Sequence, residues 1–409
     1  MRILFINKND IHGGAGIAML RIADGLARYH HTENRIIVAK GALRRPDITR
    51  TRGRVGWMVE EAIDRVTRSF GHPYRYFPVS PAAILREALR FKPDIIHLHN
   101  THGGYFTHDL FEKLNALAPI VWTLHDMFSF TGHCAHSFDC DKWRTGCRGC
   151  PRLRDYPSLR VDRAAALLER KKALYGRIDP TIVTPSRWLD DLVGESILRD
   201  KKRIVIPNGV DTDIFTPMDK NEARRALDLP QDKTVVLLGA YGGKSNRYKG
   251  GRFIERIVRD LSDRNDVLFL HIGGRWKGCG DNVVCRGRIA SEPDMAACYA
   301  AADIYLFPSL AENCPLMAIE SIACGTPVVA FATGGVPEII THGENGYVAR
   351  YADADDLMRG LMLLLDDPAR RKTMGEQGRI KALEQFSLKV MADRYWSLFK
   401  ETMRKAAEK

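Results

Sequence analysis

Short apolar runs alternate with longer amphipathic stretches along most of the chain. The runs are three to six residues long, which is typical of buried strands rather than of helices. The candidate strands span residues 3–6, 35–39, 94–98, 120–124 and 181–184, and then 234–238, 267–272, 283–285, 304–307 and 327–331. Helical periodicity, as in residues 15–29 and 82–90, fills the intervals. Strands that alternate with helices predict parallel sheets covered by helices, which is the α/β class.

The pattern divides into two halves near residues 204–217, where Pro, Asn-Gly and Asp residues are typical of a crossing between domains. We therefore expect two Rossmann-like parallel-sheet domains, at residues 1–205 and 206–385, with a cleft between them. Residues 386–409 form a further element, because residues 388–405 have the apolar spacing of one amphipathic helix.

The 409 residues are 45% hydrophobic and 27% charged, which is ordinary globular composition and excludes a disordered chain. The chain has no apolar run near the ~18 residues of a membrane span, and it reaches Lys8 and Asp10 too soon for a secretory signal. We therefore expect a cytoplasmic protein. The formal net charge is +12, and residues 1–200 hold 31 basic against 22 acidic residues. This bias predicts an anionic partner (nucleic acid, a membrane or phosphates), and the alternative is a solvated basic surface.

Glycines follow the first candidate strand, at Gly13, Gly14 and Gly16, just before a helix. Glycines at such a place let backbone N–H groups approach an anion, with help from the helix dipole. The pattern is neither G-x-G-x-x-G nor a P-loop, so neither a dinucleotide site nor a P-loop site is supported. A tight structural turn is an equally good explanation.

A stronger pattern lies near the strand at residues 304–307. Glu312 falls on the loop after this strand, and Glu320 falls about two turns into the next helix. Both therefore lie at the carboxyl edge of a parallel sheet, where such folds bind ligands. Carboxylates accept hydrogen bonds from sugar hydroxyls, and the helix start at Pro315 and Leu316 can receive a phosphate.

With these residues the chain resembles the family 4 glycosyltransferases, which have the two-domain GT-B fold. The resemblance covers nearly the whole chain. Its motifs are Glu312 with Glu320, Gly-Thr-Pro-Val-Val (325–329), Gly-Gly-Val-Pro-Glu (334–338), Pro-Ser-Arg-Trp-Leu (185–189), Ile-Pro-Asn-Gly-Val-Asp (206–211), Tyr-Lys-Gly (248–250) and His-Leu-His-Asn (97–100). Residues 123–128 and 131–132, with the cysteines after them, resemble a subgroup that builds bacterial exopolysaccharide of colanic-acid type. The resemblance implies that the last helix crosses back to the first domain.

The resemblance also implies residue roles. Glu312 would contact the donor sugar, His125 would reach the sugar from the first domain, and Lys249 would neutralise the departing diphosphate. The other donor-binding residues would be Gly14, Gly16, Arg288, Asn313, Cys314, Pro315, Leu316 and Glu320. Many relatives have an arginine after the residue that matches Gly239, and this chain does not. Lys244 or Arg247 would replace it.

Structural alternatives stand beside these roles. A glutamate on a helix is usually solvated, His125 could hold a turn, and Lys249 could be an exposed residue at a helix start.

Asp211 and Asp213 match a D-x-D pattern, which holds a divalent metal in other glycosyltransferases. The pair lies in the predicted crossing, so we expect no catalytic metal, and Lys249 and helix N-termini would carry the phosphate charge.

Four of the nine cysteines cluster in an insert at residues 133–151, as Cys134, Cys140, Cys147 and Cys150. Four thiolates suit a closed structural zinc site, and a spacing of two between the last pair is typical of one half of it. Free thiols and a disulfide are the alternatives, and a disulfide is disfavoured in an apparently cytoplasmic chain.

The stretch 55–70 places apolar residues near one helical face with arginines close by, which fits either a helix lying on anionic lipid or an ordinary packed helix. Taken with the resemblance, we expect a retaining glycosyltransferase that moves a sugar from a UDP- or GDP-linked donor to a lipid-diphosphate-linked glycan at the inner membrane face. The alternatives are a nucleotide-sugar hydrolase or epimerase of the same fold, and a basic zinc-containing nucleic-acid binder. No RRM, KH or helix-turn-helix motif supports the last, so we expect no nucleic acid partner.

Overall fold

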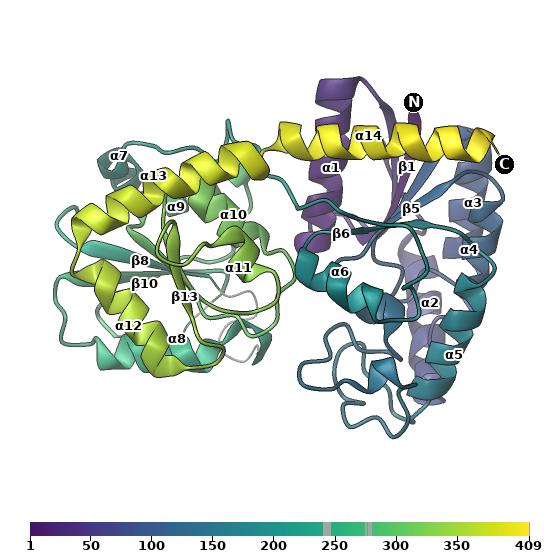
Figure 1. The fold of residues 1–409 in the computed structure, drawn as a ribbon, viewed down its shortest axis with the longest axis horizontal. Helices are drawn as coiled ribbons and strands as arrows, with labels where there is room; N and C mark the ends of the chain where they lie inside the picture. Colours follow the sequence, from purple (N-terminus) through teal and green to yellow (C-terminus); the bar gives the residue numbers. More distant parts are fainter. Residues whose placement is uncertain (240–246, 275, 277–279, 409) are drawn as a thin grey trace. The chain divides into compact units, whose positions relative to one another are not determined.

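The computed structural model describes residues 1–239, 247–274, 276 and 280–408. The chain forms two compact units. Unit 1 comprises Met1–Pro207 with Met391–Lys409, and unit 2 comprises Asn208–Val390 (Figure 1). Each unit is built on a parallel sheet covered by helices, so the prediction of two Rossmann-like α/β domains is confirmed.

Unit 1 contains a seven-stranded parallel sheet in the order β3-β2-β1-β4-β5-β6-β7. Its strands are β1 (Arg2–Asn9), β2 (Glu33–Lys40), β3 (Ile48–Arg50), β4 (Ile95–Leu98), β5 (Ile120–Thr123), β6 (Thr181–Thr184) and β7 (Arg203–Val205). Its helices are α1 (Gly14–His30), α2 (Arg54–Ser69), α3 (Ser80–Phe91), α4 (His108–Asn115), α5 (Ala164–Tyr175), α6 (Arg187–Gly194) and α14 (Leu388–Ala407), with short turns η1 (Phe128–Phe130) and η2 (Lys142–Arg144). The five strands predicted here are confirmed, and β3 and β7 are additional.

Unit 2 contains a six-stranded parallel sheet in the order β10-β9-β8-β11-β12-β13. Its strands are β8 (Thr234–Gly239), β9 (Val267–Ile272), β10 (Val283–Cys285), β11 (Ile304–Phe307), β12 (Val328–Phe331) and β13 (Gly346–Ala349). Its helices are α7 (Lys220–Ala226), α8 (Gly251–Asp260), α9 (Glu292–Ala301), α10 (Leu316–Ala323), α11 (Val336–Ile339), α12 (Ala354–Leu365) and α13 (Pro368–Gln385), with the short turn η4 (Arg247–Lys249). The central strands β8, β11 and β12 are buried except for Thr234 at the start of β8, as expected for a sheet covered on both faces.

The chain ends in α14, which packs on the sheet of unit 1. The Tyr395 hydroxyl on α14 lies 3.0 Å from Thr123 Oγ1, which in turn lies 2.8 Å from His97 Nε2. His30 on α1 lies 2.8 Å from the carboxylate of Asp393. The last helix therefore packs in the core of unit 1, although unit 2 separates it in the chain from the rest of unit 1.

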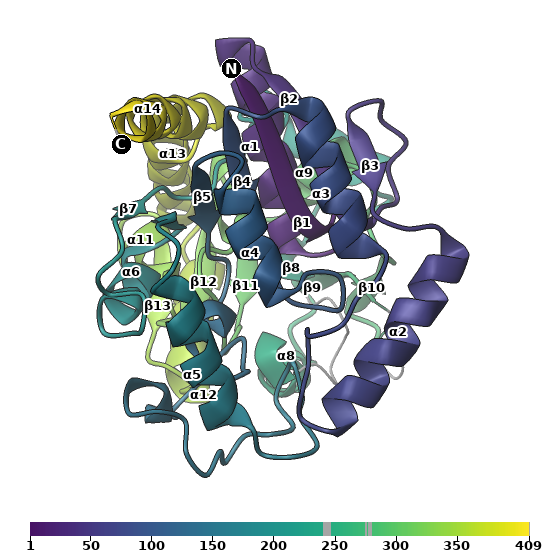
Figure 2. The ribbon, with the colours of Figure 1, turned by 90° about the vertical axis from the view of Figure 1, so that its right-hand side faces the viewer.

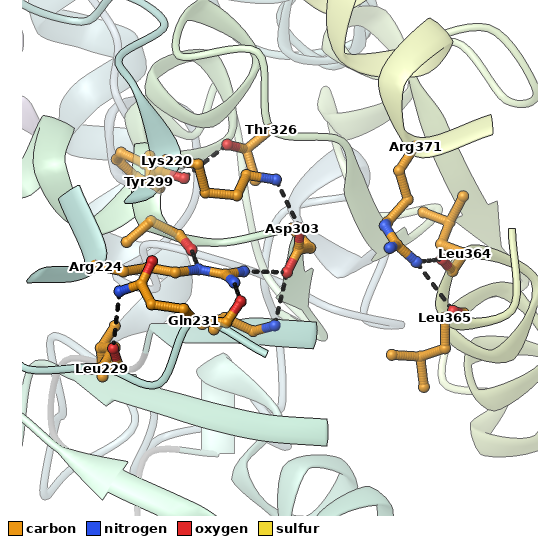
Figure 3. Close-up of polar contacts among 12 residues, drawn as sticks. Lys220, Arg224, Leu229, Gln231, Tyr299, Asp303, Thr326, Leu364, Leu365 and Arg371 are labelled. Atoms are coloured by element: carbon orange, nitrogen blue, oxygen red, sulfur yellow. Dashed lines mark hydrogen bonds and ion pairs between the residues drawn. The ribbon is translucent and has the colours of Figure 1, made fainter. Parts of the chain in front are cut away.

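A buried carboxylate fixes the central strands of unit 2 at their amino ends. Asp303, just before β11, accepts hydrogen bonds from Arg224 (2.6 Å), Lys220 (2.6 Å) and the backbone N–H of Val235 in β8 (2.7 Å) (Figure 3). Arg224 also donates to the carbonyl of Gln231 at 3.1 Å. The network joins α7 to β8 and β11. The opposite ends of these two strands lead to the loops that hold Lys249 and Glu312.

No helix among the described residues combines the length and the apolar character needed to cross a membrane.

Candidate active site

Two loops of unit 2 bring a lysine and a glutamate into direct contact. Lys249 Nζ lies 2.5 Å from Glu312 Oε1, and the hydroxyl of Ser309 lies 2.6 Å from the same oxygen. The Lys249 side chain is 30% exposed and that of Glu312 is 10% exposed, so the pair is partly shielded from water. Partial shielding strengthens the field that the two charges present to a ligand.

A glycine allows the two loops to approach so closely. Gly250 has φ +67°, and a Cβ atom at this position would lie 1.9 Å from the carbonyl oxygen of Pro308. The Leu310 N–H donates to the carbonyl of Tyr248 at 2.8 Å, which joins the loops a second time. The motif Tyr-Lys-Gly therefore has a physical explanation, because any larger residue after Lys249 would push it away from Glu312.

The residues after Glu312 lead into the N-terminus of α10. The Asn313 carbonyl accepts from the Gly335 N–H at 3.0 Å, and the Cys314 carbonyl accepts from the Asn208 side chain at 2.9 Å. Helix α10 begins after Pro315, which provides no side-chain cap, and its first turn has no acidic residue. The start of this helix therefore suits an anionic ligand.

Glu320 lies inside unit 2, with 6% of its surface exposed. The hydroxyl of Tyr299 on α9 donates to Glu320 Oε2 at 3.1 Å. Tyr299 is fully buried, and burial, together with the neighbouring carboxylate, raises its pKa well above the ordinary value. Glu320 is thus an oriented, buried carboxylate and not the solvated helix residue of the structural alternative. No spacing or motif joins Tyr299 to Glu320, so the role of Tyr299 could not be predicted from the sequence.

The remaining predicted donor residues of unit 2 are less well defined. Arg288 follows β10 and is exposed. Gly239 ends β8, where a Cβ atom would lie 2.4 Å from the terminal methyl of Met317 on α10. Arg247 begins η4, two residues before Lys249. Lys244 lies outside the described residues.

In unit 1, the glycine-rich turn has two kinds of glycine. A Cβ atom on Gly16 would lie 2.0 Å from the carbonyl oxygen of Asp10, so this glycine is required by packing within the turn. A Cβ atom on Gly14 would meet no described atom within 4 Å. The Asp10 carboxylate accepts from the N–H groups of Ala42 (2.6 Å) and Leu43 (2.8 Å), which fixes the turn. The structural alternative therefore accounts for Gly16, whereas Gly14 faces open space.

His125 follows β5 and contacts a second histidine. Its Nε2 atom lies 2.9 Å from Nδ1 of His99, so one ring donates and the other accepts. Burial lowers the pKa of His125 to about 4, and burial also lowers the pKa of His99 well below its ordinary value. Both rings are therefore neutral near pH 7, which suits a hydrogen-bonding role better than an ionic one.

Further polar groups surround His125 that the sequence analysis did not assign. The Asp126 carboxylate accepts from the Phe128 N–H at 2.9 Å and lies 3.6 Å from His102 Nε2, and burial raises its pKa to about 6. Lys8 Nζ donates to the hydroxyl of Tyr156 at 3.2 Å. Lys8, His102 and Asp126 lie at or just after the carboxyl ends of β1, β4 and β5, and this shared position is the signal that could have found them.

The cysteine insert contains free thiols. Cys134, Cys140, Cys147 and Cys150 are all unpaired with each other, and His133 Nε2 lies 3.4 Å from Cys150 Sγ. Among the described residues, no three His, Cys, Asp or Glu side chains are arranged to hold a metal ion. The geometry therefore gives no support to a zinc site, which stays a prediction that elemental analysis of protein purified without chelators would decide.

Two parallel-sheet units, each with polar residues at the carboxyl ends of its strands, have the arrangement of the GT-B fold of glycosyltransferases. Sequence comparison agrees. The family model described as "Glycosyltransferase Family 4" matches residues 12–214, and the model described as "Glycosyl transferases group 1" matches residues 219–381. The chain therefore belongs to the group 1 glycosyltransferases.

The sequence identity between this chain and individual relatives is low. The chain is 28% identical over 260 residues to WcaC of Escherichia coli, which is named as a colanic acid biosynthesis glycosyl transferase; the match spans 61% of this chain and 62% of WcaC. Among solved structures, sucrose-phosphate synthase from Thermosynechococcus elongatus has a TM-score of 0.72 at 20% identity, over 99% of each chain. HepE from Anabaena in complex with UDP-glucose has a TM-score of 0.66 at 16% identity, over 99% of this chain and 100% of HepE. At these identities the structures establish the fold alone.

Proposed function

We propose that this protein is a retaining glycosyltransferase that moves a sugar from a nucleotide diphosphate sugar to a lipid-linked oligosaccharide, in the synthesis of bacterial surface polysaccharide or exopolysaccharide. The observation that carries the proposal is the contact between Lys249 and Glu312 beside the start of α10. A cation and a positive helix end suit a diphosphate, and a carboxylate beside them suits sugar hydroxyls.

In the donor complex, Lys249 and Glu312 would contact two different parts of one ligand. Lys249 would turn to the diphosphate, and Glu312 would accept hydrogen bonds from the sugar. Asn313, Cys314, Pro315 and Leu316 form the chain that would face both groups. Glu320, oriented by Tyr299, would accept the ribose hydroxyls. The base remains open between uridine and guanosine, and the UDP-glucose complex of HepE makes UDP the first nucleotide to test.

The proposed reaction forms the new bond on the face of the sugar from which the leaving group departs. The bond from C1 to the phosphate oxygen breaks, the acceptor oxygen bonds to C1, and the acceptor proton passes to the departing phosphate. Lys249 stabilises the charge that develops on this phosphate, which is the step where a fixed cation contributes most. Because the lysine supplies this charge, we propose that the reaction needs no divalent metal.

Unit 1 would bind the acceptor at the carboxyl ends of β1, β4 and β5. The neutral ring of His125 can exchange hydrogen bonds with sugar hydroxyls, and its orientation is fixed by His99. Lys8 adds a positive charge at the same edge, which suits the diphosphate of a lipid-linked acceptor. The similarity to WcaC supports an acceptor on a polysaccharide pathway.

A thermal-unfolding screen with UDP, GDP and their sugar conjugates tests the donor class without knowledge of the acceptor. A ligand that binds the folded protein raises the unfolding temperature in proportion to the logarithm of its concentration over Kd. A donor identified in this way is then incubated with lipid-linked acceptors from a bacterial membrane extract, and the anomeric proton of the product is examined by NMR. Inversion at C1 would contradict the retaining mechanism. No shift with any nucleotide would contradict the donor site.

A further inference from the structure

Helix α2 buries acidic residues and exposes apolar residues, which is the opposite of an ordinary helix at a protein surface. Its buried residues are Glu60 and Asp64. The exposed fractions are 76% for Val55, 57% for Met58 and 68% for Phe70. Val59 (44%) and Val66 (56%) continue the same side of the helix, and Trp57 is 36% exposed. Of the two alternatives for residues 55–70, an ordinary packed helix would bury its apolar side, and α2 does not.

Specific contacts of the buried carboxylates hold α2 with its acidic side inward. Glu60 pairs with Arg52, and both side chains are almost completely buried. Glu60 also accepts from the N–H groups of Val79 (2.8 Å) and Ser80 (2.7 Å) and from the Ser80 hydroxyl (2.6 Å). One turn later, Asp64 pairs with Arg68. A carboxylate with so many donors would lose them all if the helix rotated, so the apolar side stays outward.

The outward side has the length and the charge of a surface that meets anionic lipid. Val55 and Phe70 are fifteen residues apart, which spans about 22 Å of helix. Arg54 and Arg65 are exposed beside the apolar residues, and the two inward carboxylates of α2 are buried, which leaves Glu61 as its one partly exposed acid. Figure 2 shows α2 at the edge of unit 1, with no described helix or strand beyond it on that side.

We propose that the outward side of α2, from Val55 to Phe70, docks on a membrane surface that contains anionic lipid. Bulky apolar side chains would enter the interface, and the flanking arginines would meet the lipid phosphates. Lipid is favoured over a second copy of the chain, because two copies of this side would bring equal positive charges together. The surface is separate from the residues proposed for donor binding, and its docking needs neither donor nor acceptor.

Vesicle flotation of the full chain tests the proposal with three matched variants. The apolar variant is Val59→Ser, Val66→Ser and Phe70→Ser. The charge variant is Arg54→Glu and Arg65→Glu. The control is Arg86→Glu and Leu89→Ser on α3, because Arg86 is exposed and Leu89 is 54% exposed in the same unit. Thermal unfolding of each variant confirms that it is folded, as expected for changes to exposed side chains.

The wild type and the control should bind vesicles of phosphatidylcholine with one third phosphatidylglycerol, and this binding should weaken with salt. The apolar variant should bind roughly tenfold more weakly or worse, and the charge variant roughly twentyfold. Equal binding to pure phosphatidylcholine, no binding at all, or wild-type binding by both variants would overturn the proposal. Self-association that the apolar variant abolishes, without vesicle binding, would assign the surface to a second copy.

Discussion

Lys249 Nζ and Glu312 Oε1 lie 2.5 Å apart, on loops that follow two adjacent strands of the sheet in unit 2. The loops follow β8 and β11, and the absence of a side chain on Gly250 permits their contact. This contact is the best-defined one of the site, so a change to either residue should alter the reaction.

Replacement of Lys249 by Met should lower kcat for sugar transfer by roughly a hundredfold to a thousandfold, because a fixed cation opposite the leaving group is lost. Glu312→Gln should also lower kcat/KM, and the double variant should lose less than the sum of the two in free energy, since the residues are in contact. Initial rates with saturating donor measure the effect. Lys113→Met removes an exposed lysine that pairs with Asp109, and it should leave the rate unchanged. Additive losses in the double variant would contradict a functional pair.

Tyr299→Phe removes the hydroxyl that donates to Glu320 and leaves the ring in place. The carboxylate then loses its orientation, so we expect the donor KM to rise about tenfold with kcat nearly unchanged. Steady-state kinetics with varied donor concentration separate the two constants. Tyr305→Phe is the matched control, because its buried hydroxyl contacts the Met317 sulfur at 3.6 Å and not a carboxylate. A fall in kcat alone would show that Tyr299 acts on chemistry or stability and not on donor binding.

Much of the fold could be predicted because central strands of parallel sheets are continuous apolar runs. The strands that were missed, β3, β7 and β13, all lie at a sheet edge. Every residue of β7 and two of three in β3 are half-buried, so neither has a fully apolar run. Strand β13 begins at Gly346, where a Cβ atom would lie 2.3 Å from the Val328 carbonyl oxygen. Because glycine has no side chain, Gly346 adds nothing to an apolar run in the sequence.

Part of the site could be predicted, because some of its residues lie in motifs that are local in the sequence. Glu312, Glu320 and Lys249 lie in recognisable local motifs, whereas Tyr299 contributes through a contact that only the packed fold creates. The orientation of α2 was also beyond the sequence, because apolar periodicity predicts which residues share a face but not where that face points. Glu60 decides the direction through partners at Arg52 and Ser80, and no pattern in the sequence joins these three residues.

The buried histidines of unit 1 predict a loss of stability in acid. Burial lowers the pKa of His97 to about 3, whereas a histidine in the unfolded chain titrates near pH 6.5. Between these values the unfolded state binds one more proton at this position, so the free energy of unfolding falls as the pH falls, by roughly 1.4 kcal/mol per pH unit. His97→Gln, which can still hydrogen-bond Thr123, should lose about that part of the pH dependence in urea unfolding between pH 6.5 and 5. His72→Gln changes an exposed histidine and should leave the pH dependence as it is. An unchanged slope in His97→Gln would mean that His97 titrates normally.

The Asp303 network predicts a large effect on stability at a distance from the site. Asp303→Ala would leave Arg224, whose side chain is 5% exposed, without its carboxylate partner inside unit 2. Removal of one partner of a buried ion pair costs about 3–5 kcal/mol, because the remaining charge stays desolvated. The unfolding transition of unit 2 in urea should move by this amount, while donor KM in the folded protein stays close to that of the wild type. Asp366→Ala breaks an exposed ion pair with Arg264 and should cost less than about 1 kcal/mol. If Asp303→Ala were as mild as this control, the network at the amino ends of β8 and β11 would not be what holds the two strands together.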